Sequence, residues 1–319
     1  MSSGNQFQFE LWQECNNVCK FCYLGQENRF TPDEVKIKSL HELIDIIDEI
    51  DRTESYTNIS VIGGEFFQGQ LRNPEVKELF QIMYRKLFAF MDKDWENRGS
   101  WFSATLTIGD NKDLYEMLDE YYQTETYKHS IDGLWICTSW DSIGRFHTDL
   151  ARTTWENHMK NLTLKYPKMH KNTCIILTND LMEKYIAGDI NFSSFAKEFG
   201  TQIFMKVPDF GSFGSKEIME SKVPGFFPTR KNAMKFLGKV AMTEPEYLRR
   251  MTNVNFRADI LIKSGNNGSH KDCIRFKDQL NEYGKEATSL PCGHSTYYNC
   301  YIDSDACFKC DLANILEDM

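Results

Sequence analysis

The sequence predicts an α/β fold, a partial (β/α)6 TIM-type barrel followed by a small cysteine-rich module at the C-terminus. Short β-rich segments alternate with amphipathic helical segments six times within residues 1–210. Such a series is typical of a parallel sheet with right-handed crossover connections. Because six units fall short of the eight that close a full barrel, the barrel is expected to be open. The last 47 residues hold five of the ten cysteines, which sets them apart from the rest of the chain.

The strands are predicted from short runs of apolar and β-branched residues. The first run alternates Phe7, Phe9 and Leu11 with polar residues, as a half-buried strand does. The second run ends at a pair of glycines. The six predicted strands are 7–11, 59–62, 102–108, 134–138, 173–177 and 203–207.

The helices are predicted where apolar residues recur at three- and four-residue spacing. The first helix is expected to begin at a capping box formed by Ser39 and Glu42. The second is expected to begin at Pro74, with Asn73 as its N-cap. The helical apolar faces lie within 40–50, 76–87, 114–121, 155–162 and 193–199.

Three regions follow from this organisation. The barrel is expected over 1–210, a helical connecting region over 211–264, and the cysteine-rich module over 265–319. The connecting region contains a predicted helix that opens at 228–230. A Gly- and Asn-rich turn at 264–269 separates it from the module.

Composition and charge argue against two classes of protein, general duplex DNA-binding proteins and membrane-spanning proteins. Lys and Arg number 37 and Asp and Glu number 46 among 319 residues, which gives a formal net charge of −9. Coating duplex DNA requires many basic phosphate contacts, so general duplex DNA binding is not expected. The sequence has no run of 18 apolar residues and no basic-then-apolar leader. We therefore expect no membrane span and a cytoplasmic location.

Clustered cysteines in a reducing compartment indicate metal or iron–sulfur ligands. Cys15, Cys19 and Cys22 follow the first predicted strand with the spacing Cys-x3-Cys-x2-Cys. Three thiolates at this spacing can bind three irons of a [4Fe–4S] cubane and leave the fourth iron open to a small molecule. The alternatives are three unrelated core thiols and a zinc knuckle, although structural zinc normally has four protein ligands. Cys137 and Cys174 lie within apolar strands and are expected in the core.

This cysteine motif resembles the cluster motif of the radical S-adenosylmethionine (SAM) superfamily, whose usual fold is a partial (β/α)6 barrel. The resemblance implies that the open iron chelates the amino and carboxylate groups of SAM. One-electron reduction then cleaves SAM to methionine and a 5′-deoxyadenosyl radical, which abstracts a hydrogen atom from a substrate. A one-electron donor such as flavodoxin or ferredoxin is then expected as a partner.

The segment after the second strand is predicted to contact SAM. Gly63 and Gly64 allow the backbone to approach a ligand closely, and Glu65 supplies an acceptor for an ammonium group. The resemblance assigns this segment to the amino group of SAM. Phe21, which precedes the last cysteine of the motif, is also expected at the cofactor site. The alternative for the Gly-Gly-Glu segment is an ordinary turn at a strand end.

Further cofactor contacts are predicted near the third and fourth strands. Ser139 opens a segment similar to the Ser-x-Asp segment that lies near SAM in peptide-modifying members of the superfamily. Arg152 lies where those members carry an arginine that pairs with the SAM carboxylate. Thr105 and Thr107, on the third predicted strand, can bond the SAM ribose. The alternatives are a solvated surface arginine and threonines that only favour a strand.

The tail resembles the auxiliary-cluster module, called SPASM or twitch, of many radical SAM enzymes. A turn at 303–306 is expected to fold Cys310 back towards Cys292, with Cys273 and Cys307 as further ligands. Alanine replaces the turn glycine of that module, and five cysteines stand in place of its seven. We therefore expect one auxiliary [4Fe–4S] cluster, and the alternative is a structural zinc site.

The predicted function is that of a radical SAM enzyme catalysing an oxidoreductase- or transferase-type modification. The Ser139 segment and Arg152 favour a peptide or protein side chain as the substrate. Radical modification of a small molecule, a nucleotide or a nucleic-acid base is the alternative within enzymes. Outside enzymes, the alternative is a non-catalytic iron–sulfur or zinc protein, which the Gly-Gly-Glu segment disfavours.

Overall fold

The computed structural model describes most of the first 250 residues and two short strands of the tail. The described residues are 5–17, 19, 30–54, 57–123, 125–127, 133–146, 148–206, 221, 223–250, 288–289 and 295–296. Contacts divide the chain into two compact units. The first unit is Met1–Ser139, Arg145–Thr173 and Glu198–Gln202, and the second is Trp140–Gly144, Cys174–Lys197 and Ile203–Met319.

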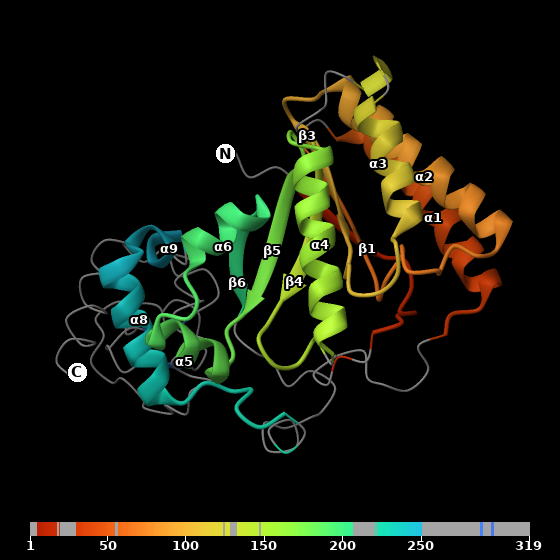
Figure 1. Cartoon of the computed structure of the whole chain (residues 1–319). Helices are drawn as coiled ribbons and strands as arrows, with labels where there is room; N and C mark the ends of the chain where they lie inside the picture. Colours follow the sequence, from red (N-terminus) through yellow and green to blue (C-terminus); the bar gives the residue numbers. More distant parts are fainter. Residues whose placement is uncertain are drawn as a thin grey trace. The chain divides into compact units, whose positions relative to one another are not determined.

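Six strands form one sheet, in the order in which they occur along the chain (Figure 1). They are β1 (Asn5–Glu10), β2 (Thr57–Ile62), β3 (Arg98–Ser103), β4 (Leu134–Trp140), β5 (His170–Ile176) and β6 (Gln202–Lys206). The strands are parallel and alternate with helices. The α/β class and the six strand–helix units of the sequence prediction are therefore confirmed.

The main helices are α1 (Asp33–Thr53), α2 (Pro74–Lys93), α3 (Lys112–Gln123), α4 (Asp149–Lys165), α5 (Asn179–Ala187), α6 (Phe192–Phe199), α8 (Arg230–Thr243) and α9 (Pro245–Arg250). A 3-10 turn, η1 (Glu125–Tyr127), follows α3. In the tail, β7 (Thr288–Ser289) pairs antiparallel with β8 (Ser295–Thr296). The predicted turn at 303–306 lies outside the described residues. Among the described residues, none of the helices has the length and apolar character that crossing a bilayer requires.

The starts of the helices agree with the sequence prediction at α2 and differ from it at α1. As predicted, the Asn73 side chain caps α2, accepting hydrogen bonds from the N–H groups of Glu75 and Val76. The predicted capping box at Ser39 is wrong, because α1 already begins at Asp33, directly after Pro32. Proline fixes a backbone angle suited to this entry, and acidic residues in the first turn complement the helix dipole. The short helices α5 and α9 were not predicted.

The third strand ends earlier than predicted. β3 stops at Ser103, so Thr105 and Thr107 lie in the loop that follows the strand. Between them Leu106 has a φ of 59°, in the left-handed region, and is fully buried. A strand cannot continue through that conformation, which costs a non-glycine residue roughly 1–2 kcal/mol. Hydrogen bonds from the neighbouring Thr105 to Glu65 and from Thr107 to Asn17 hold this loop in place.

Aromatic and apolar residues of β3 and β4 pack against α2 and α4 and form part of the core. The Phe102 ring of β3 lies 6.2 Å from the Phe80 ring of α2, and Trp155 of α4 donates a hydrogen bond to Thr138 of β4 at 3.0 Å. Side chains alternate across β4, so Cys137 projects from the opposite face. Cys137 and Cys174 are only half-buried, which corrects their predicted place in the core.

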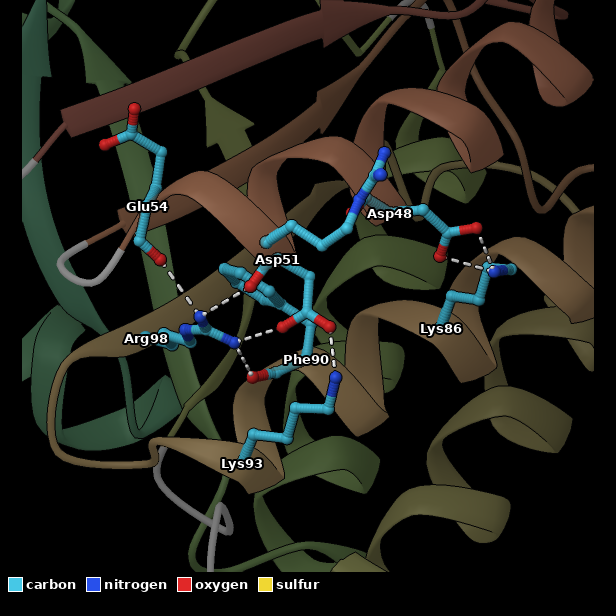
Figure 2. Close-up of polar contacts among 8 residues, drawn as sticks. Asp48, Asp51, Glu54, Lys86, Phe90, Lys93 and Arg98 are labelled. Atoms are coloured by element: carbon cyan, nitrogen blue, oxygen red, sulfur yellow. Dashed lines mark hydrogen bonds and ion pairs between the residues drawn. The ribbon is translucent and has the colours of Figure 1, made fainter.

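A buried arginine ties the end of α1 to the start of β3 (Figure 2). The Arg98 guanidinium donates to the Asp51 carboxylate at 2.5 Å and to the backbone carbonyls of Asp51, Glu54 and Phe90. It also lies 4.3 Å from the centre of the Phe90 ring. Its side chain is 8% exposed, so these acceptors replace the water that a guanidinium otherwise keeps. Lys93 adds a second cation to the Asp51 carboxylate.

Asp51 makes the stability of this junction depend on pH. Burial opposes its ionisation, but hydrogen bonds from Lys93 and Arg98 outweigh burial and hold the pKa of Asp51 below its usual range. The stabilisation is therefore complete above the unfolded-state pKa of about 4 and is lost as the pH falls through the lower folded-state value. Asp51→Asn should lower the free energy of unfolding by roughly 2 kcal/mol at neutral pH, with the difference shrinking in acid.

The control for this variant is Asp48→Asn. Asp48 pairs with Lys86 on the same helices, but its side chain is 52% exposed, so the expected loss is below about 1 kcal/mol. Urea unfolding followed by circular dichroism at several pH values measures both variants. Equal losses for the two variants, or a loss at Asp51 that is constant down to pH 2, would contradict the assigned role.

Candidate functional site

The loop after β1, which carries the first cysteines, is joined to the loop after β2. The N–H of Gly64 donates to the carbonyl of Trp12 at 2.9 Å, and the N–H of Glu65 donates to the carbonyl of Glu14 at 2.8 Å. The backbone pairing of the two parallel strands thus continues beyond them into the loops. Loops that follow neighbouring parallel strands meet at the same edge of a sheet, where ligands bind in α/β proteins.

Gly63 and Gly64 are required by this pairing. A Cβ atom at Gly63 would lie 2.5 Å from the Trp12 carbonyl oxygen, and one at Gly64 would lie 2.3 Å from that of Glu14. Side chains are excluded at such distances, so only glycine lets the two loops approach. The sequence prediction explained these glycines by close approach to a ligand. The structure shows that the backbone they approach is that of the cysteine loop.

Glu65 joins the loops after β2 and β3 through its side chain and the loop after β1 through its backbone N–H. Its side chain is 1% exposed. One carboxylate oxygen accepts from the N–H groups of Phe66 and Phe67, each at 2.8 Å. The other oxygen accepts from the N–H of Thr105 at 2.7 Å and from the Thr105 hydroxyl. These four donors match the roughly four lone-pair positions of a carboxylate. A cationic ligand at Glu65 would therefore have to share the carboxylate oxygens with these donors.

Asn17, which no sequence pattern indicated, connects the cysteine loop to the loop after β3. Its side chain is fully buried. Its Nδ2 donates to the Thr105 hydroxyl at 2.8 Å, and its Oδ1 accepts from the Thr107 hydroxyl. Both threonines therefore serve the protein's own hydrogen bonds, and a ribose contact by Thr107 stays a prediction.

The cysteine motif is described at two of its three positions. Cys15 is half-buried and Cys19 is buried, whereas Cys22 and Phe21 lie outside the described residues. The Cys15 sulfur accepts from the backbone N–H of Asn17 at 3.4 Å and from its Nδ2 at 3.5 Å. N–H donors of this kind suit a thiolate that binds iron. Within the described residues there is no set of three or more His, Cys, Asp or Glu side chains placed to hold a metal ion.

A buried ion pair anchors the residue that precedes Cys15. Lys36 of α1 is 3% exposed, and its ammonium lies 2.6 Å from the Glu14 carboxylate and 3.1 Å from the backbone carbonyl of Gln70. The same ammonium lies 5.6 Å from the centre of the Trp12 ring. The signal in the sequence was a lysine in line with the apolar stripe of a helix, at 36, 40, 43 and 47. A lysine in such a stripe needs a buried partner.

Lys36→Met should destabilise the protein strongly, because it leaves the Glu14 carboxylate without its cation. Breaking a buried pair on one side costs about 3–5 kcal/mol. Lys38→Met is the control on the same helix, since Lys38 is 78% exposed and pairs with exposed Glu42. Chemical unfolding of both variants measures the difference. If the Lys36 variant unfolds at the same denaturant concentration as the Lys38 variant, the ion pair does not anchor the loop.

Two further predicted residues, Ser139 and Arg152, are described on β4 and α4. Ser139 is half-buried on β4. Arg152 lies on α4, where its guanidinium stands 5.5 Å from the centre of the Phe146 ring. The set that the structure brings together is Cys15, Asn17, Gly64, Glu65, Thr105 and Thr107. The tail cysteines 273, 292, 307 and 310 lie outside the described residues.

Comparison of the chain with models of protein families found no match, and comparison with curated proteins found none either. The function is therefore inferred from the cysteine motif and from the way these loops are held.

Proposed function

We propose that this protein is a radical SAM enzyme whose sheet curves into a partial (β/α)6 barrel. The observation that carries the proposal is the joining of the Cys15 loop to the Gly63–Glu65 segment at the carboxyl ends of β1 and β2. A thiol-rich loop and an acidic, glycine-containing loop meet there on a parallel sheet. This combination supports a cluster site with a bound small molecule better than it supports a zinc knuckle, for which a fourth protein ligand is not evident in the motif.

In this proposal Cys15, Cys19 and Cys22 hold a [4Fe–4S] cluster, and SAM binds against the Gly63–Glu65 segment. When bound, the cluster supplies the electron that cleaves SAM to methionine and a 5′-deoxyadenosyl radical. Glu65 keeps the loops after β1, β2 and β3 in a fixed relation through its backbone N–H and its side chain, so that the SAM site is formed before the ligand arrives. Such preorganisation removes the need to order loops during binding.

The remaining assignments rest on the sequence. Ser139 and Arg152 are proposed to contact SAM, and the segment around them favours a peptide or protein side chain as the substrate. A nucleotide or nucleic-acid base is the second candidate. A cytoplasmic one-electron donor such as flavodoxin or ferredoxin would reduce the cluster.

Reduction of the anaerobically reconstituted protein tests the proposal. With dithionite, we expect an electron paramagnetic resonance (EPR) signal of a reduced four-iron cluster, and we expect SAM to change that signal because it binds the open iron. A protein that binds zinc and stays silent under these conditions is not a radical SAM enzyme. An iron signal that SAM leaves unchanged would indicate a non-catalytic iron–sulfur protein.

For the tail we propose a second [4Fe–4S] cluster held by Cys292 and Cys310 with Cys273 and Cys307. The parent should then bind about eight irons per chain, and a variant lacking the three N-terminal cysteines should keep about half of them. Iron near zero in that variant, with one equivalent of zinc, would replace the second cluster by a structural zinc site.

A further inference from the structure

We propose that Asn17 is a positioning residue that sets the reduction potential of the cluster at Cys15, through hydrogen bonds to the Cys15 sulfur. This inference rests on the proposed function, since it needs a cluster at the cysteine motif. It goes beyond that function by assigning control of the potential to a side chain that is not an iron ligand.

Two N–H groups of Asn17 point at the sulfur. The backbone N–H lies 3.4 Å from the Cys15 Sγ atom and the side-chain Nδ2 lies 3.5 Å from it. The side chain is fully buried, so water does not compete for the sulfur from that side. Hydrogen bonds to cluster sulfurs are among the features that set cluster potentials.

The orientation of the Asn17 amide is determined by a chain of donors and acceptors. The Glu65 carboxylate accepts only, so the single hydroxyl proton of Thr105 is directed to it. The Thr105 oxygen then faces Asn17 with a lone pair and accepts from Nδ2 at 2.8 Å. On the other side, Oδ1 accepts from the Thr107 hydroxyl. The amide therefore presents its NH2 group, and not its oxygen, to the Cys15 sulfur.

The direction of the effect follows from charge. Reduction adds one electron, taken from an external donor, and neither forms nor breaks a bond. The added charge spreads onto the sulfurs, and an N–H donor stabilises the more negative sulfur more strongly. Removing the Nδ2 donor should therefore make the potential more negative and the cluster harder to reduce.

The matched variants are Asn17→Leu and Asn16→Leu. Asn16 is the neighbouring residue, but its exposed side chain donates to the backbone carbonyl of Gln68, and not to a sulfur. Redox titration of the reconstituted proteins, followed by EPR, measures the midpoint potential. At a fixed potential we expect the ratio of reduced to oxidised cluster to fall about tenfold in Asn17→Leu, a shift of about 59 mV for one electron. Asn16→Leu should have the same midpoint potential as the parent.

A second pair keeps the test decisive if the buried leucine prevents folding. Asn17→Asp removes the Nδ2 donor yet still accepts from Thr107, and Asn16→Asp adds the same charge one residue away. A more negative midpoint in Asn17→Asp than in Asn16→Asp supports the proposal. Equal midpoint potentials for the Asn17 and Asn16 variants of either pair overturn the proposal. Loss of the cluster from both Asn17 variants, with the cluster kept in both Asn16 variants, also overturns it and would assign Asn17 to folding. A parent without any four-iron cluster overturns the proposed function itself.

Discussion

Replacement of Cys15, Cys19 and Cys22 together by alanine is expected to abolish formation of 5′-deoxyadenosine from SAM under dithionite. The reason is that these thiolates are the proposed ligands of the cluster that delivers the electron. Cys15 already receives two N–H donors, and Cys19, four positions further along the chain, is buried. The product is measured by liquid chromatography and mass spectrometry on anaerobically reconstituted protein.

The matched control is the double variant Cys137→Ala/Cys174→Ala. Both of these cysteines are half-buried on strands and belong to no proposed cluster. This control should form 5′-deoxyadenosine at close to the parent rate. If the triple variant does so as well, Cys15, Cys19 and Cys22 do not hold the reactive cluster. If only the double variant is inactive, the reactive cysteines lie on the strands.

Glu65→Gln should cost the protein roughly 3 kcal/mol of unfolding free energy, and SAM binding should weaken with it. The amide places an NH2 group where the carboxylate accepts hydrogen bonds, so at least one buried N–H or hydroxyl donor loses its acceptor. The contacts at risk run to Phe66, Phe67 and Thr105, which belong to the loops after β2 and β3. Urea unfolding and anaerobic titration with SAM measure the two effects.

The control is Glu10→Gln at the exposed end of β1, which should change the unfolding free energy by less than about 0.5 kcal/mol. Should Glu65→Gln bind SAM weakly but unfold like the parent, Glu65 is a direct ligand of SAM and not a clamp between loops. Should it leave both quantities unchanged, Glu65 has no part in the site.

The sequence predicts a helix or strand correctly where neighbouring residues alone determine its start or end. Asn73 and Pro74 mark a helix start that depends on neighbouring residues alone, and α2 begins there. The end of β3 could not be read in this way, because Leu106 has a strand-forming neighbourhood but a left-handed backbone. That conformation is imposed by bonds from Glu65 and Asn17, which are distant in sequence.

The site residues that were predicted belong to local sequence patterns, whereas those that were missed depend on partners distant in sequence. The cysteine spacing and the Gly-Gly-Glu segment are local patterns, and the structure brings Cys15 and this segment into joined loops. Asn17 and Lys36 act through partners found only in the folded chain: Thr107 lies 90 positions from Asn17. The role of Gly63 was also hidden, since the atom it must avoid is the Trp12 carbonyl oxygen.

Reductive cleavage of SAM by the parent protein is measured by analysis of its two products. The protein is reconstituted with iron and sulfide without oxygen, reduced with dithionite and incubated with SAM, and 5′-deoxyadenosine and methionine are quantified. We expect both products to accumulate in equal amounts and only when reductant is present. A fully iron-loaded protein that forms neither product, or forms them equally without reductant, would contradict it.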